Sequence, residues 1–376
     1  MANISQLIAP SGVLTAADAF RYESVSGATQ ALDVGASDFF NAGTLTSDVT
    51  VSFSNVPTEA RWSYSFVGDL ASFYDIENAS YDSVSLDVSG QDSEPRGLFF
   101  KDDGTKMYVI GSTNNAVFQY SLSTAWDVST ASYDSVSFSV SSQETTPQSL
   151  FFKDDGTKMY VVGYVNDTVY QYSLSTAWDL STASYDSISF SVSSQDTLPN
   201  ELSFKDDGAK MYVVGQGSST VHQYSLSTAW DVSTASYDSV SFNVSSQETT
   251  PQGIFFKDDG TKMYVVGVFN DTVYQYSLST AWDLSTASYD SVSFSVASQD
   301  TGPTGIFFKD DGTKMYVTGR DGDTVYQYST GSYPTITLPA SVQNSPSEPF
   351  EADRVTYTFF TDDGGANVHL ISEEIE

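Results

Sequence analysis

Apolar and polar positions follow a repeating order through the middle of the chain, and one copy illustrates it. Apolar residues alternate with serine in SYDSVSFSV (132–140), which predicts a half-exposed strand. SLFF (149–152) is a short apolar run that leads into an Asp-Gly turn, and MYVVG (159–163) is continuously apolar, as expected for a buried strand. TVYQYSLS (168–175) follows a second turn. Since no segment has a helical period, the pattern predicts four short antiparallel strands per copy.

The same order of strands occurs five times. KDDGTKMYV, or a close variant of it, begins at 52-residue intervals, at Lys101, Lys153, Lys205, Lys257 and Lys309. Four short strands per repeat are typical of one blade of a β-propeller. An alternating strand at 81–89 precedes the first full repeat, and the last repeat ends at 324–329 without one. We therefore predict an all-β chain with a five-bladed propeller that 81–89 closes; a solenoid would leave that strand as an exposed edge.

The segments on either side of the repeats have a different pattern. Residues 32–68 and 333–375 read as short strands separated by turns, and TYTFFT and ANVHLIS flank a DDGG turn that predicts a hairpin. The chain enters and leaves the propeller at neighbouring points of one blade, which is the geometry that permits an insertion. We expect a β-sandwich formed by 1–73 and 331–376, with the propeller, 74–330, inserted into it.

Four strings in the flanks resemble a known module. They are QALDVGASDFFNAGTLTSDVTVSFSNVP (30–57), WSYSF (62–66), ITLPASV (336–342) and TFFTDDGG (358–365). Together they resemble a small β-sandwich found in tail-fibre-like and other virion proteins of tailed bacteriophages, in which these pieces run on continuously. The resemblance implies a virion protein whose terminal sandwich contacts other virion proteins.

Composition excludes several classes of function. The formal net charge of −33 excludes nucleic acid as a partner, because binding phosphates requires a basic surface. The chain has no cysteine, which excludes disulfides, thiolate metal sites and cysteine nucleophiles. No run approaches 18 apolar residues, so membrane insertion is not expected. The start, 1–12, lacks the basic and apolar regions of a secretory signal.

Candidate catalytic residues are scarce. His222 occupies the position that Phe118 and three tyrosines fill in the other repeats, so we interpret it as a replaced aromatic residue. Glu201 is the one acid at the start of the innermost strands, and a glycosidase needs a second carboxylate. We therefore expect that the chain is not an enzyme, and a carbohydrate-active enzyme is the least favoured of three functions.

One acidic position recurs in each repeat, after a glutamine and before the innermost strand. These residues are Asp92, Glu144, Asp196, Glu248 and Asp300. A carboxylate ring at one mouth of the channel would suit a cation such as Ca²⁺. The alternative is a solvated turn that recurs because the repeat recurs, and the sequence leaves both open.

Differences between the copies concentrate in two of the four connections. The turn after the second strand and the segment before the first strand vary, whereas the other two connections are nearly identical. In an up-and-down blade the two variable connections lie on one face. We predict that this face binds a ligand through Tyr164, Gln216, Phe269, Arg320 and Asp321, with Arg96, Gln148, Asn200 and Gln252 nearer the axis.

These observations favour a structural protein of a phage virion, a tail fibre or another appendage that acts as an adhesin. It would be assembled in the host cytoplasm, exposed on the particle, and present its propeller to a host surface ligand such as a glycan. The second hypothesis is a non-adhesive decoration or cement protein of the capsid or tail. Whether the chain forms a homo-oligomer stays open.

Overall fold

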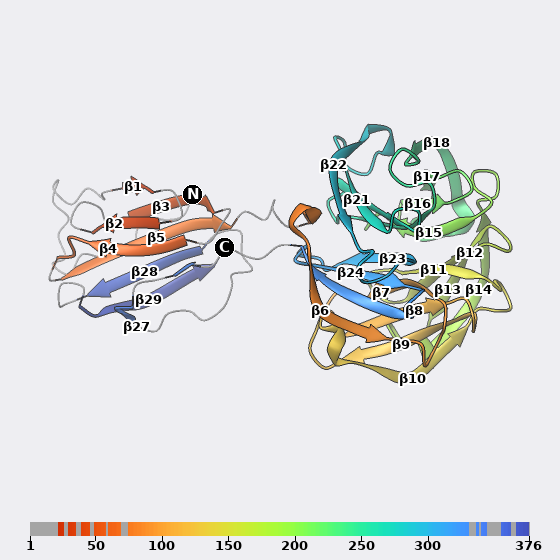
Figure 1. The fold of residues 1–376 in the computed structure, drawn as a ribbon, viewed down its shortest axis with the longest axis horizontal. Coiled ribbons are helices and arrows are strands. Elements are labelled where there is room, and N and C mark those ends of the chain that lie inside the picture. The colour runs from red at the N-terminus through yellow and green to blue at the C-terminus, as the bar shows by residue number, and fades with distance from the viewer. Residues whose placement is uncertain are drawn as a thin grey trace. The chain divides into compact units, whose positions relative to one another are not determined.

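The computed structural model describes residues 22–25, 29–34, 39–45, 49–57, 59–68, 74–330, 336–337, 340–343, 355–361 and 366–375 (Figure 1). The chain divides into two compact units, Met1–Ser72 with Ser332–Glu376 and Phe73–Gly331. These bounds lie one residue from the expected ones. The start of the chain, 1–12, and the DDGG turn, 362–365, lie outside the described residues.

The unit Phe73–Gly331 is a propeller of five four-stranded antiparallel sheets. Blade 1 contains β7 (Pro95–Phe100), β8 (Lys106–Gly111), β9 (Ala116–Leu122) and β10 (Ala131–Ser139). Blade 2 contains β11 (Pro147–Phe152), β12 (Lys158–Gly163), β13 (Thr168–Leu174) and β14 (Ala183–Ser191). Blade 3 contains β15 (Pro199–Phe204), β16 (Lys210–Gly215), β17 (Thr220–Leu226) and β18 (Ala235–Asn243). Blade 4 contains β19 (Pro251–Phe256), β20 (Lys262–Gly267), β21 (Thr272–Leu278) and β22 (Ala287–Ser295).

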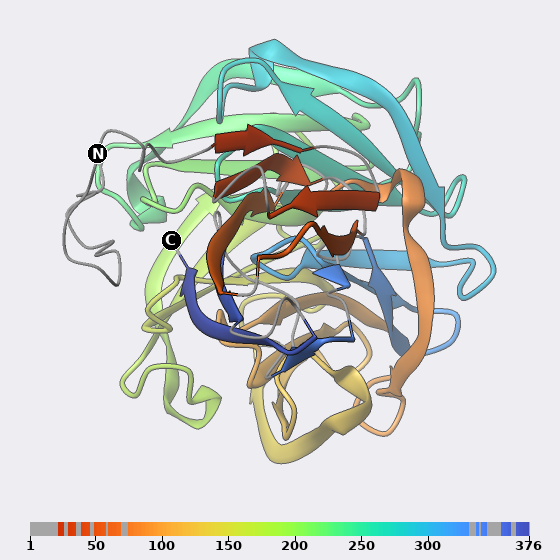
Figure 2. The ribbon, with the colours of Figure 1, turned by 90° about the vertical axis from the view of Figure 1, so that its left-hand side faces the viewer.

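Blade 5 joins two distant parts of the sequence. It contains β23 (Pro303–Phe308), β24 (Lys314–Gly319), β25 (Thr324–Ser329) and β6 (Ser80–Asp87). In Figure 2 the orange β6 lies beside the blue strands of this blade. The strands β25 and β6 pair antiparallel, with Thr324 opposite Asp87 and Ser329 opposite Ser80. The predicted closure of the ring is therefore confirmed.

Each blade is fastened to the next through a tryptophan. A buried tyrosine of the second strand donates its hydroxyl to that tryptophan's carbonyl, as Tyr108 does to Trp178 at 2.6 Å. The tryptophan has a positive φ, and its ring lies over the glycine of the KDDG turn, where a Cβ on Gly156 would come within 2.5 Å of it. In the seam next to the closing blade, Tyr74 takes the tryptophan position and accepts from Tyr264. Both the turn and the seam therefore require this glycine.

A short 3-10 turn precedes each fourth strand. These turns are η2 (Ile76–Asn78), η3 (Val128–Thr130), η4 (Leu180–Thr182), η5 (Val232–Thr234) and η6 (Leu284–Thr286). An aspartate caps each one, as Asp127 does by accepting from the amide of Ser129 at 3.0 Å. The capping aspartate explains why the AWD string recurs with the repeat.

The second unit is built from both ends of the chain. One sheet contains, in order, β1 (Tyr22–Ser24), β3 (Phe39–Leu45), β5 (Ala60–Gly68), β28 (Val355–Thr361), β29 (Val368–Ile375) and β27 (Val342–Gln343). The other contains β2 (Thr29–Asp33), β4 (Val49–Ser54) and β26 (Ile336–Thr337). Side chains of both sheets, among them Leu32, Val51, Trp62 and Phe359, share one core. This is the expected β-sandwich. The described residues include no helix that is long and apolar enough to cross a membrane.

Candidate functional site

Two sets of connections lie together on one side of the propeller, which we call the variable face. They are the turns after the second strands (112–115, 164–167, 216–219, 268–271 and 320–323) and the segments before the first strands (88–94, 140–146, 192–198, 244–250 and 296–302). A backbone hydrogen bond joins the two sets in each blade, as from Tyr164 to Thr146 at 3.2 Å. The KDDG turns, and the points where the chain enters and leaves the propeller, lie on the other side, the constant face.

The acidic ring expected at the mouth of the channel has a different role. Each of its five carboxylates is at least 95% buried and is bound by backbone amides of its own blade. Glu144 accepts from the amides of Thr146 at 2.8 Å, Val165 at 3.2 Å and Asn166 at 3.4 Å. The other four members, Asp92, Asp196, Glu248 and Asp300, make the same set of three contacts.

These acids hold the variable loops instead of forming a metal ring. Each ties the tip of one variable turn to the segment beside it, and a Cβ on Gly163 would lie 2.4 Å from Glu144 Cγ. Within the described part of the chain there is no group of three or more acidic or histidine side chains that could hold a metal ion. The expectation of a cation ring and that of a solvated turn both fail, because the amides of the loop use the carboxylate oxygens.

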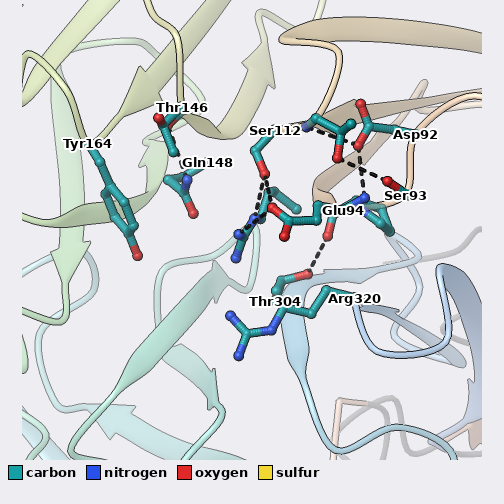
Figure 3. Close-up of polar contacts among 12 residues, drawn as sticks. Asp92, Ser93, Glu94, Ser112, Thr146, Gln148, Tyr164, Thr304 and Arg320 are labelled. Carbon is teal, nitrogen blue, oxygen red and sulfur yellow. Dashed lines mark hydrogen bonds and ion pairs between the residues drawn. The ribbon is translucent and has the colours of Figure 1, made fainter.

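Two arginines from neighbouring blades, Arg96 and Arg320, lie on the variable face, and Figure 3 shows Arg320 in the region of Glu94 and Ser112. Arg96 donates from Nε to Ser112 at 3.1 Å and from an amino group to Glu94 at 3.1 Å. The Ser112 hydroxyl and the charges of Arg96 and Arg320 lower the pKa of Glu94, against its slight burial. The guanidinium of Arg320 has a longer contact, 3.7 Å, with Asp321. The contacts of Ser112 and Glu94 with Arg96 were not predicted, because neither residue stands out in the repeat.

Tyr164 reaches from blade 2 toward the axis of the propeller. Its hydroxyl donates to Asn200 of blade 3, whose amide donates to the carbonyl of Pro251 in blade 4 at 2.6 Å. Burial raises the pKa of Tyr164 to about 12, although Arg96 and Arg320 act in the opposite direction. Tyr164 was predicted to bind a ligand, and its side chain is half-buried.

The predicted amide side chains near the axis are buried. Gln148 and Gln252 are each 4% exposed and Asn200 2%. Gln252 donates to Gln216 at 3.1 Å, and Gln148 to the carbonyl of Thr146 at 3.1 Å. In blade 5 a threonine, Thr304, takes this position and donates to the carbonyl of Pro95. The structure therefore brings the predicted axial residues together, as a layer of amides under the face.

The three large apolar side chains that are exposed in the described part of the chain all lie on the variable face. Val165 is 57% exposed, Phe269 64% and Leu198 37%. Phe269 was predicted as a ligand-binding residue, whereas Val165 and Leu198 were not. They belong to blades 2, 3 and 4, while the two arginines belong to blades 1 and 5. The variable face therefore has an apolar side and a cationic side.

Glu201 lies deeper, on the innermost strand of blade 3. It accepts from the hydroxyl of Ser149, and burial raises its pKa well above the usual range. It lines a cavity of about 110 Å³ together with apolar side chains of the inner strands, such as Leu202 and Phe255, and with acidic side chains of the KDDG turns. A buried carboxyl in its protonated form can donate a proton or a hydrogen bond.

The first aspartates of the KDDG turns meet at the opposite end of this cavity, on the constant face. They are Asp102, Asp154, Asp206, Asp258 and Asp310. Partial burial and the charges of the other members raise the pKa of Asp154 and Asp258 to about 6 and that of Asp310 to about 7. Each residue stays exposed on its outer side, so water screens part of the repulsion. The sequence shows them only as turn residues, because their convergence depends on closing the ring.

His222 packs as the aromatic residue that it replaces. Its ring contacts Tyr237 edge-on at 5.9 Å between centroids, as Tyr274 contacts Tyr289 in the next blade. Burial lowers the pKa of His222, so the imidazole is neutral at pH 7. This agrees with the interpretation from the sequence.

Several solved structures are similar to this chain at low sequence identity. A functionally unknown protein from Desulfotomaculum acetoxidans has 11% identity over 75% of this chain and 70% of its own, with a TM-score of 0.39. A protein from Bacteroides uniformis, provisionally described as a 6-phosphogluconolactonase, has 13% identity over 61% and 66%, with a TM-score of 0.40. A luciferin-regenerating enzyme has 12% identity over 68% and 99%, with a TM-score of 0.41. No family model and no curated protein matches the sequence.

These names correct one expectation. From the sequence we expect that the chain is not an enzyme. Proteins named as enzymes are, however, among the solved structures that this chain resembles. That conclusion is therefore withdrawn. At these identities the likeness concerns the fold and assigns no reaction to this chain.

Proposed function

We propose that this chain is a structural protein of a phage virion whose propeller binds a host surface ligand through the variable face. The observation that carries the proposal is the coincidence of three properties on that one face. Sequence variation between the blades, the exposed apolar side chains Val165, Leu198 and Phe269, and the two arginines all occur there. Neutral variation alone would also have altered the turns of the constant face.

The scaffold beneath the variable loops supports this proposal. Five buried carboxylates fix the tips of the turns, so residues at those tips can differ without loss of the blade. A rigid frame with variable loops is the usual way to position binding residues. The attachment to other virion proteins through the sandwich follows from the sequence resemblance and belongs to the same proposal.

The test is binding of the purified chain to a panel of bacterial cells. Combining Tyr164→Ala, Phe269→Ala and Arg320→Ala should abolish binding to the cells that the unchanged chain binds. The matched control replaces three lysines of the constant face, Lys101, Lys205 and Lys257, by alanine. Both triple variants should keep the melting temperature within a few degrees. Binding that survives the first set would refute an adhesive role for this face, and the cement-protein hypothesis would then take its place.

A second candidate, a carbohydrate-active enzyme, is favoured by one observation. Glu201 is a buried carboxyl beside a cavity, and burial raises its pKa, which is the direction required of a general acid. The cavity, about 110 Å³, is smaller than the roughly 300–1,000 Å³ of pockets that enclose larger ligands, so it favours a small substrate. Turnover of a glycan by the unchanged chain, lost in Glu201→Gln, would establish this activity.

A further inference from the structure

The cations of the propeller are divided between its two faces according to type. All ten lysines of the propeller belong to the repeated KDDGTK strings, or to the variant KDDGAK at 205–210, and pair with aspartates, as Lys205 pairs with Asp207 at 2.5 Å. The two arginines, Arg96 and Arg320, have no counterpart in the other blades and lie on the variable face. The lysines thus recur with the repeat, whereas each arginine occurs in a single blade.

Arg96 is held in a fixed orientation. Its side chain is 12% exposed, and Ser112 and Glu94 bind two of its nitrogens. The Ser112 hydroxyl also donates to Glu94 at 2.9 Å, so the serine, the glutamate and the guanidinium form one network. A guanidinium fixed in this way loses little conformational entropy when it binds a ligand.

The side chain of Arg320 is more exposed than that of Arg96 and extends toward the axis of the propeller. Its side chain is 36% exposed, and among the described residues its recorded partner is Asp321, at 3.7 Å from Nε. Asp321 is itself held by the hydroxyl of Thr301 at 2.9 Å. Figure 3 shows Arg320 extending toward the region where Gln148 and Tyr164 also point. The terminal amino groups of Arg320 are thus directed at the axis, where a ligand would enter.

Both guanidinium charges act on the same neighbours. Each lowers the pKa of Glu94, and each opposes the burial that raises the pKa of Tyr164. Glu94, which binds Arg96 at 3.1 Å, is therefore within the electrostatic reach of Arg320 from blade 5, and Figure 3 shows Arg320 in the region of Glu94 and Ser112. Planar guanidinium groups bind carboxylates and phosphates through paired, charge-assisted hydrogen bonds.

We propose that Arg96 and Arg320 together bind a single anionic group, a carboxylate or a phosphate, on a surface glycan. This inference rests on the proposed function and names the chemistry of the ligand. The sugar attached to that group lies against the apolar side of the face, where Phe269 and Val165 are exposed. One anion per site, rather than a polyanion, fits a chain whose net charge is −33, because long-range repulsion disfavours dense negative charge.

Matched oligosaccharides test the charge requirement directly. A neutral oligosaccharide that ends in one galacturonate is compared with its methyl ester, and a dextran oligomer that carries one phosphate with the same oligomer unphosphorylated, all by calorimetry on the full chain. We expect at least one acidic probe to bind at least about tenfold more tightly than its neutral counterpart. The acidic probe that binds identifies the group as carboxylate or phosphate.

Variants connect that preference to the two arginines. Arg96→Gln and Arg320→Gln should each weaken binding of the acidic probe about tenfold, whereas Lys205→Gln, with the same change of charge on the constant face, should leave it unchanged. Glu94→Gln should strengthen binding several-fold, because it removes the carboxylate that competes for Arg96. Melting temperatures of all four variants report whether the fold is retained, and Arg320→Gln removes no close protein contact.

The outcomes separate this inference from the proposed function. Equal binding of acidic and neutral probes, or unchanged affinity in both arginine variants, overturns the anionic ligand but leaves an adhesive face in place. Failure of every acidic probe to bind also overturns it. Loss of cell binding when Tyr164→Ala and Phe269→Ala are combined and both arginines are kept depends on the proposed function alone.

Discussion

Replacing Asp82 by asparagine should loosen the strand that closes the propeller. Asp82 lies on β6 and accepts from Lys314 at 2.6 Å, Ser329 at 2.6 Å and Gln327 at 3.0 Å. All three donors belong to β24 and β25, more than 230 positions away along the chain. The matched residue Asp186 has the same kind of partners within the contiguous blade 2.

The cost follows from these contacts. A hydrogen bond to a charged group contributes about 1.5–3 kcal/mol, and a partly exposed ion pair about 1 kcal/mol or less. Asparagine keeps one oxygen acceptor but turns an amide donor toward the donors of Lys314 and Gln327. We therefore expect Asp82→Asn and Asp186→Asn to lower the free energy of unfolding by about 2 kcal/mol each.

The two variants should differ in local opening. β6 is joined to its blade by pairing with β25 and not by a connecting turn, so weakening it lets the strand detach while the other blades persist. Asp186 lies on β14, which a short connection joins to its neighbour β13. Limited proteolysis should therefore cut near residues 74–90 faster in Asp82→Asn than in Asp186→Asn.

The effect also has a defined pH dependence. Burial alone would raise the pKa of Asp82, but hydrogen bonds from Lys314, Ser329 and Gln327 lower it below the ordinary value of 3.8. A lowered pKa stabilises the fold above pH 3.8, and this contribution is lost as the pH falls through the folded-state pKa. Denaturant titrations at pH 7 and near pH 2 should show the difference between the unchanged chain and Asp82→Asn at pH 7 only. Equal cleavage in both variants, or no loss of stability at pH 7, would refute the reasoning.

Three further predictions concern the propeller. Gly305→Ala should destabilise the propeller by about 1–3 kcal/mol, because its Cβ would lie 2.8 Å from a neighbouring backbone carbonyl, whereas Gly90→Ala, with open space around it, should not lower the melting temperature. The raised pKa of Glu201 makes its ionisation in the folded state unfavourable, so the unchanged chain should lose stability as pH rises above 4.5. Glu201→Gln should not show this loss. An equal change in melting temperature between pH 4 and pH 8 in both chains would contradict the prediction. Tyr316→Phe should cost about 1–2 kcal/mol in denaturant titration by leaving the carbonyl of Trp126 without its 2.6 Å hydrogen bond, and an unchanged midpoint would count against that bond.

The architecture was largely predictable because its determinants are local or periodic. Alternation in SYDSVSFSV marks an outer strand, and continuous apolar character in MYVVG marks a buried one. The count of strands then leaves 81–89 without a blade of its own, which predicts the closure seen between β6 and β25. The variable face could be predicted by comparing the five repeats, because locating the variable turns requires the sequence alone and no side-chain contacts.

The acidic positions show where this reasoning stops. A recurring carboxylate such as Glu144 has the same appearance in the sequence whether it binds a cation, faces solvent or accepts from amides. Its burial depends on how the segment before the first strand packs against the next variable turn. Asp154 is the converse case. The sequence shows it as an ordinary turn residue, whereas the structure places it in a cluster of five aspartates.

By itself the sequence determined the number of blades, the four strands of each, the closing strand and the division of the chain into two units. Each of these depends on the spacing and polarity of residues close together along the chain. Only the tertiary structure decided which polar groups meet, such as Tyr164 with Asn200 and Asn200 with Pro251. These groups come from different blades, and their distances are set by the diameter of the closed ring and the packing of its inner strands, which no local pattern encodes.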